Sequence, residues 1–134
     1  MHAAGEFDVK LSPLEPYNKT EGARLARMSL DKRFHGALDA TSQGEMLSAR
    51  AAVEGSAGYV AIERVDGTLE GRRGSFVLQH NATMTRGEPY LNIVVVPDTG
   101  TGELEGLTGS MNIRIEGGKH YYDFDYTLPG QSSR

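Results

Sequence analysis

Apolar and polar residues alternate along most of this chain with a period of two. Between residues 6 and 11, for example, Phe7, Val9 and Leu11 are separated by the charged Asp8 and Lys10. This alternation is typical of a β-strand with one face in a core, because successive side chains of a strand point to opposite faces. We expect about eight strands, at residues 6–11, 25–38, 45–53, 59–65, 75–85, 90–96, 110–116 and 120–128.

Turn signals separate these segments. Residues 12–22 contain two prolines and predict a loop, residues 36–43 predict a turn, and Gly117-Gly118 predicts a hairpin. Residues 25–38 and 45–53 also fit a helix, but Ser, Phe and Gly in the first and flanking glycines around the second favour strands.

A ten-residue segment occurs twice. Residues 67–76 and 102–111 share glycine at positions 1, 5 and 8, Leu-Glu at positions 3 and 4, and Ser followed by a large apolar residue at positions 9 and 10. Glycine at such spacing suits a chain that leaves one strand, turns with positive φ and begins another strand. The repeat therefore predicts two turns and carries no chemistry.

Eight strands with short connections favour antiparallel neighbours, and such a series can close into a barrel that has no free edges. We predict an all-β fold with a single eight-stranded antiparallel barrel spanning residues 1–134 and an ordered core at about 5–128. A two-sheet β-sandwich is the alternative. No segment has the pattern of a crossover helix, which argues against an α/β fold.

Composition narrows the classes of function. The net charge is −4 and the basic residues are dispersed, which argues against nucleic acid as a partner. No apolar run approaches the roughly 20 residues needed to span a bilayer, and no signal-peptide pattern is visible, so we expect a cytoplasmic protein without membrane partners. The chain has no cysteine, its four histidines lack ligand spacing, and no nucleotide or phosphate motif occurs, so we expect no metal and no cofactor.

Several stretches in their order resemble one bacterial family. They are Glu15-Pro16-Tyr17, Glu63-Arg64, residues 67–80 ending in Gly-Ser-Phe-Val-Leu-Gln-His, residues 96–109 and Tyr122-Asp123-Phe124-Asp125-Tyr126. Together they are similar to a bacterial family of unknown function with an allene-oxide-cyclase-like barrel. The resemblance covers about residues 5–128 and implies one oligomeric eight-stranded barrel. It implies no established reaction, and no functional residue of allene oxide cyclases or dirigent proteins can be placed on this chain.

Glu63 is the first candidate for chemistry, because it shares a strand face with Tyr59, Ala61 and Val65. If that face lines the lumen, burial should raise the pKa of the Glu63 carboxyl and suit it to general acid–base catalysis. The structural alternative is an ion pair with an arginine on an adjacent strand.

His80 is the second candidate catalytic residue. A hairpin that turns near Glu70-Gly71 brings residues 78–80 opposite Glu63, so either His80 or Gln79 shares its face, depending on the register. The plainer reading is a structural histidine. Tyr59, Asn92 and Tyr126 complete the candidate ligand-binding set with Gln79, although tyrosines in such positions more often serve core packing.

Two functional hypotheses follow from this sequence. The first is a small-molecule-binding barrel that holds an apolar ligand in its lumen, with isomerase- or cyclase-like activity as one outcome. The second is a non-catalytic, oligomeric structural barrel whose own side chains fill the interior. A cavity of about 300 Å³ or more lined by Glu63 would favour the first. Apolar residues on both faces of residues 90–96 also predict a homo-oligomer.

Overall fold

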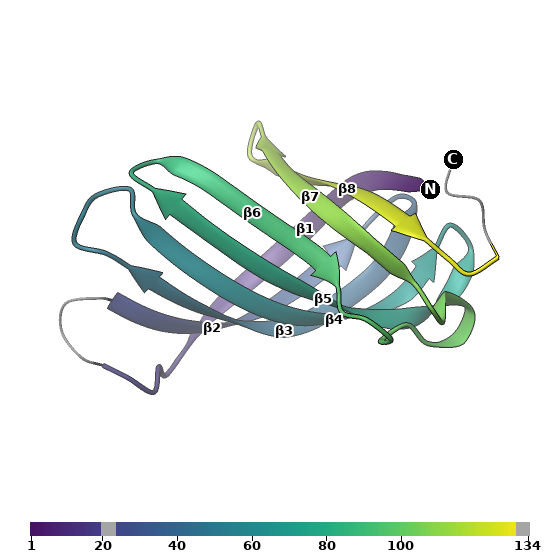
Figure 1. Ribbon diagram of the computed structural model, residues 1–134, viewed down its shortest axis with the longest axis horizontal. Helices are drawn as coiled ribbons and strands as arrows, with labels where there is room; N and C mark the ends of the chain where they lie inside the picture. The colour runs from purple at the N-terminus through teal and green to yellow at the C-terminus, as the bar shows by residue number, and fades with distance from the viewer. Residues whose placement is uncertain (20–23, 131–134) are drawn as a thin grey trace.

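The computed structural model describes residues 1–19 and 24–130 and shows one closed antiparallel barrel in which each strand pairs with its neighbours in the chain (Figure 1). The prediction of an all-β, eight-stranded barrel is confirmed, and the sandwich alternative is excluded by the closure of β1 on β8. The elements are β1 (His2–Leu14), β2 (Arg24–Phe34), β3 (Leu38–Arg50), β4 (Ala57–Leu69), β5 (Arg72–Thr85), β6 (Glu88–Val95), the 3₁₀ turn η1 (Gly102–Leu104), β7 (Thr108–Glu116) and β8 (Lys119–Thr127).

The boundary between β2 and β3 differs from the prediction. The expected turn at residues 36–43 is confined to residues 35–37, because β3 already begins at Leu38. The inward positions Leu38, Ala40 and Ser42 are buried, and all three pair with β4. Pairing and burial therefore outweigh the local preference of this segment for a turn. The loop expected at residues 12–22 begins only after Leu14, and its residues 20–22 lie outside the described residues.

The first copy of the repeat forms the hairpin between β4 and β5, as predicted. Glu70 and Gly71 occupy its turn with φ of 47° and 86°. The second copy differs, because η1 lies within it and its turn at Gly106 leads into β7. The same glycine spacing thus serves a tight hairpin in one place and a longer connection in the other.

Closure divides the barrel into two halves. Only Ile93 and Val94 of β6 pair with β7, and the pairing of β1 with β8 ends at Phe7 and His120. In Figure 1 the β7–β8 hairpin consequently stands apart from the tips of the β3–β4 and β5–β6 hairpins. We call the part beyond these last pairs, toward the three hairpin tips, the open half. The remainder, which holds the start of β1 and the end of β8, is the closed half.

Aromatic side chains fill the closed half. Phe34 packs 5.6 Å from Phe7 and edge-on to Tyr122 at 5.5 Å, while Phe76 stacks on Phe124 at 5.7 Å, all between ring centroids. Such contacts add stability beyond the apolar area that they bury. The Tyr122 hydroxyl also accepts a hydrogen bond from the Leu38 N–H at 2.9 Å and donates one to the carbonyl of His35 at 2.8 Å. This half is a packed core.

The inner wall of the open half is different, because its apolar side chains stay in contact with solvent. Leu11, Met84 and Ile115 lie on the inward face of β1, β5 and β7, yet are 47%, 44% and 66% exposed. The wall between them consists of small or flexible half-buried residues, among them Met28 and Met46, which pair with each other. An apolar surface therefore faces the lumen here without a core to cover it.

Candidate functional site

Four polar residues meet inside the barrel where the closed half gives way to the open half. The Glu63 carboxylate, which is 0% exposed, accepts a hydrogen bond from Lys32 Nζ at 2.8 Å on Oε2 and one from Ser42 Oγ at 2.6 Å on Oε1. His80 Nε2 lies 2.5 Å from the same Oε2. We refer to Lys32, Ser42, Glu63 and His80 as the polar cluster; every buried polar side-chain atom of the described residues has a hydrogen-bond partner.

The strand register brings these residues together from four strands. Glu63 of β4 lies opposite Leu78 of β5, so His80 is one inward position further along and reaches the carboxylate diagonally. On the other side, Glu63 faces Gly44 of β3. A Cβ at Gly44 would lie 2.0 Å from the Ile62 carbonyl oxygen and 2.9 Å from the Glu63 Cβ, so the missing side chain is what allows β3 and β4 to approach this closely at Glu63.

The pKa of Glu63 shifts in the direction opposite to the sequence-based expectation. Burial alone raises the pKa of the carboxyl, but the hydrogen bond from His80 and the charge of Lys32 outweigh burial and lower it to about 2. Glu63 is therefore an ionised, fully engaged carboxylate at neutral pH, and it is a poor general acid or base. The structural alternative named an arginine of an adjacent strand as the ion-pair partner of Glu63; the observed lysine partner is Lys32 of β2, across β3.

A contact between His80 and Tyr59 extends the polar cluster toward the open half. While His80 Nε2 faces Glu63, its Nδ1 lies 3.4 Å from the hydroxyl of Tyr59, which is inward on β4 and half-buried. When His80 donates Nε2–H to the Glu63 carboxylate and is neutral, its Nδ1 is the acceptor that the Tyr59 hydroxyl can donate to. Burial and the charge of Glu63 raise the pKa of the Tyr59 phenol, so it remains a hydrogen-bond donor at neutral pH.

Lys32 and Ser42 are the members of the polar cluster that sequence reasoning missed. Lys32 stands between Leu30 and Phe34 on the inward face of β2, and this break in an apolar face was the available signal. Its ammonium lies 5.0 Å from the centroid of the Phe7 ring and 5.8 Å from that of Phe34, which adds cation–π attraction to the ion pair. Ser42 was missed because it lies in the segment, residues 36–43, that the sequence predicted as a turn.

Three predicted ligand-binding residues lie elsewhere. Gln79 and Asn92 are exposed on the outer face of β5 and β6, since the alternate positions, His80 and Ile93, are the inward ones. Tyr126 is inward but belongs to the closed half, where its hydroxyl donates a hydrogen bond to Glu70 at the β4–β5 turn. The structure therefore brings together Glu63, His80 and Tyr59 and separates the other three from them.

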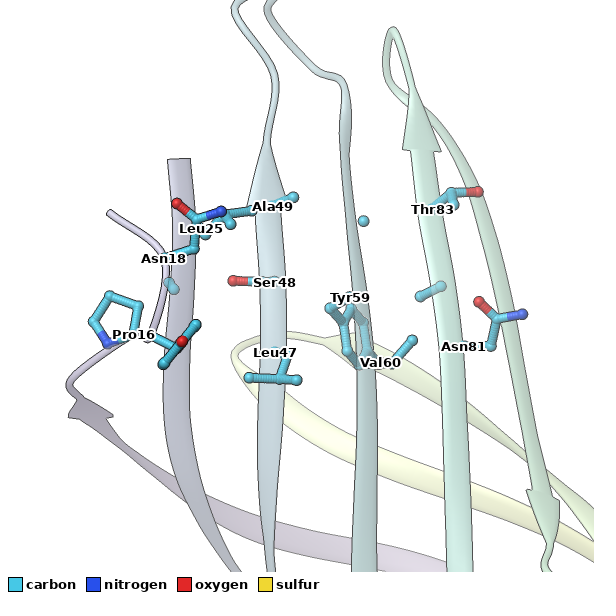
Figure 2. Close-up of a pocket in the computed structure, with 14 residues that line it drawn as sticks. Pro16, Asn18, Leu25, Leu47, Ser48, Ala49, Tyr59, Val60, Asn81 and Thr83 are labelled. Carbon is cyan, nitrogen blue, oxygen red and sulfur yellow. The ribbon is translucent and has the colours of Figure 1, made fainter. Parts of the chain in front are cut away.

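One hollow lies mainly on the outer face of the barrel. It is a groove of about 520 Å³ across β2–β5, bordered by Pro16, Tyr17 and Asn18 after β1 (Figure 2). Most of its strand residues, such as Leu47 and Val60, face outward in register with each other. A second, more polar hollow of about 470 Å³ lies between β1 and the β7–β8 hairpin. Glu63 lines neither hollow, so neither is the Glu63-lined cavity that the first functional hypothesis called for.

Within residues 1–19 and 24–130, no set of three His, Asp or Glu side chains is placed to hold a metal ion. Helices of membrane-spanning length and hydropathy are likewise lacking in the part of the chain that the structure describes.

Comparisons with known proteins identify relatives whose function is also open. The model of the family DUF3224, described as a protein of unknown function, matches residues 3–126. A crystal structure of a DUF3224 protein of unknown function from Shewanella oneidensis MR-1 is 55% identical, with a TM-score of 0.94 and coverage of 98% of both chains. No curated protein matches the chain.

Proposed function

The chain belongs to the DUF3224 family, and from that premise we propose that it is a small-molecule-binding barrel that holds an apolar ligand in the open half of its lumen, against Tyr59 and His80. One observation carries this proposal. His80 contacts the buried Glu63 on one side and the Tyr59 hydroxyl on the other, and Tyr59 adjoins the exposed apolar inner wall of the open half. Ligand sites commonly combine an apolar lining with a few converging polar groups.

The energetics of the polar cluster support a functional role. Removing ions from water is costly, and replacing a buried ion pair by apolar residues of similar size is often neutral or stabilising. The aromatic core of the closed half shows that this barrel can fill its interior with apolar side chains. Retaining Lys32, Glu63 and His80 in the lumen is therefore better explained by the positioning of His80 than by stability alone.

The arrangement suits proton transfer of the isomerase or cyclase type. Tyr59 would donate a hydrogen bond to a ligand oxygen, while His80 Nδ1 accepts a proton from the neighbouring carbon. For a ligand with a C=C bond β,γ to its carbonyl, the C–H electron pair forms a dienolate whose negative oxygen Tyr59 stabilises. His80 then returns the proton to the γ carbon, so that the double bond moves to the α,β position and the carbonyl forms again. Glu63 would position the imidazole and stabilise its charged form, and Lys32 would keep Glu63 ionised.

The test separates binding from chemistry. Neutral carbonyl compounds with apolar chains are screened by displacement of the neutral dye Nile red, and each ligand found is incubated in D₂O to detect deuterium next to its carbonyl by NMR. We expect Tyr59→Phe to keep the fold and to lose at least about tenfold of the exchange rate, since one charge-stabilising donor is removed. The matched control is Tyr90→Phe, because Tyr90 is exposed on the outer face.

Absence of any displacement by the parent protein would refute the proposed function. Binding without exchange, unchanged in His80→Gln, would retain the binding role and refute the proton transfer.

The outer face supports a second role, that of an oligomeric structural barrel. Exposed apolar residues, among them Leu25, Leu47 and Val60, lie on the outer face of β2, β3 and β4 along the groove of Figure 2, and we infer that a second copy of the chain covers them. Leu47 and Val60 are directly paired at its centre, with exposed Ile62 two residues along β4. The described residues that line the groove include no charged side chain, and the nearby Arg27 and Glu45 neutralise each other at 2.7 Å, so a partner would have little charge to desolvate there.

Sedimentation equilibrium at micromolar concentration tests this role. We expect the parent to sediment as a homo-oligomer and Val60→Glu to dissociate it, because the new charge would be buried unpaired. Ile115→Glu introduces the same change outside this face and is the matched control. A monomeric parent would exclude the oligomer.

A further inference from the structure

Two arginines stand opposite each other at the lip of the open half. Arg24 begins β2 and Arg50 ends β3, and the two are direct partners in the ladder. Both share the inward parity of their strands, because Leu30 and Lys32 of β2 and Ala40 and Ser42 of β3 are the buried positions. The pleat thus places both guanidinium groups on the lumen side of the mouth.

This pair has no acidic partner among residues 1–19 and 24–130. The neighbouring Arg27, which faces outward, binds Glu45 at 2.7 Å, whereas Arg24 and Arg50 take part in no ion pair there. Like charges directly opposite each other destabilise a sheet unless a counter-charge lies between them. An anion between the two guanidinium groups would remove that repulsion and can be bound in bidentate fashion.

The apolar inner wall lies directly below the pair. Across the sheet, Arg50 pairs with Ala57 of β4, and Ala57 pairs with Met84 of β5, so these residues form one row with Arg24 at the lip. The row that contains Ala61 and His80 lies four residues deeper along β4. At about 3.3 Å per residue, the lip is roughly 13 Å from His80. Met84 lies in the row of the lip, Met28 and Met46 lie in the row of His80, and methionine side chains adapt to flexible ligands.

From this juxtaposition we infer that the ligand of the open half is an anionic amphiphile: its carboxylate or phosphate head binds Arg24 and Arg50, and its apolar chain runs inward toward Tyr59. This inference rests on the proposed function and narrows its ligand class. It also orients the ligand, because the charged end stays at the solvent side and only an uncharged part reaches the polar cluster.

Isothermal titration calorimetry with three probes of equal chain length tests the inference: decanoate, decyl phosphate and decanol, each below its aggregation concentration. We expect at least one anion to bind about tenfold or more tightly than decanol, since a charge-assisted hydrogen bond is worth roughly that factor. The preferred anion distinguishes a carboxylate ligand from a phosphate ligand. The preference should decrease as salt increases, because both arginines are exposed.

The double variant R24Q/R50Q should bind the preferred anion about as weakly as decanol, whereas R64Q, on the outer face of β4, should behave as the parent does. Without ligand, R50Q should be at least as stable as the parent in urea, since the opposed charges are removed; a clear loss of stability would indicate a structural role and overturn the inference. Equal binding of all three probes, unchanged in R24Q/R50Q, would overturn it while leaving the proposed function intact. Failure of every probe to bind the parent would overturn both.

Discussion

Glu63→Gln is the most informative single change to this protein. The substitution retains the size of the side chain and removes its charge, so the Lys32 ammonium, with only 5% of its side chain exposed, loses its carboxylate partner. Breaking a buried ion pair in this way costs about 3–5 kcal/mol. Lys32→Met in the Glu63→Gln background removes the stranded charge and should recover about half of that loss, because the two sites are directly coupled.

The pH dependence of stability gives a second estimate of what Glu63 contributes to the free energy of unfolding. The pKa of Glu63 falls from its usual 4.5 to about 2 in the folded protein, which corresponds to about 3 kcal/mol at 1.36 kcal/mol per pH unit. Because the folded-state pKa is the lower one, this stabilisation is fully present above about pH 5 and is lost as the pH falls toward 2. The free energy of unfolding of Glu63→Gln should therefore lack this part of the acid dependence.

Urea denaturation followed by circular dichroism between pH 2 and pH 7 measures both effects. The gap between parent and Glu63→Gln should be largest at pH 7 and should narrow steadily below pH 5. Glu45→Gln is the matched control, because it breaks the exposed pair with Arg27 and should change stability far less. Parallel curves for parent and Glu63→Gln, or strict additivity of Lys32→Met and Glu63→Gln, would refute the account of the polar cluster.

Three further predictions concern the scaffold. Gly67→Ala should cost about 3 kcal/mol in urea denaturation, since its Cβ would lie 2.3 Å from the Asp39 carbonyl oxygen, while Gly58→Ala, with its nearest neighbour at 3.4 Å, should cost far less; equal losses would contradict the close strand approach. Tyr122→Phe should cost about 1–3 kcal/mol by the same assay, because it leaves the Leu38 N–H without its buried acceptor, and a neutral result would contradict that bond. Burial and the bond to Glu70 raise the pKa of Tyr126 to about 12, so stability should be lost as the pH rises from 10 to 12 and less steeply in Tyr126→Phe, which alkaline denaturation curves would show.

Much of the architecture follows from local patterns in the sequence. Alternation places Tyr59, Ala61, Glu63 and Val65 on the inward face, and the glycines near residue 71 place the β4–β5 turn, because both features depend on neighbouring residues alone. Short connections then restrict the strands to antiparallel neighbours, and the count of strands allows closure.

Tertiary structure alone decides the chemistry of the polar cluster. The pKa of Glu63 depends on Lys32, which is 31 residues distant in the chain and reaches it across β3, so no local pattern predicts whether burial or pairing prevails. Local patterns likewise cannot decide whether His80 or Gln79 faces inward, because a shift of one residue in the strand register would exchange the two. Alternation determines which side chains share a face. Only the strand register determines which of them come into contact, because it brings residues of β2 to β5 together that the sequence keeps far apart.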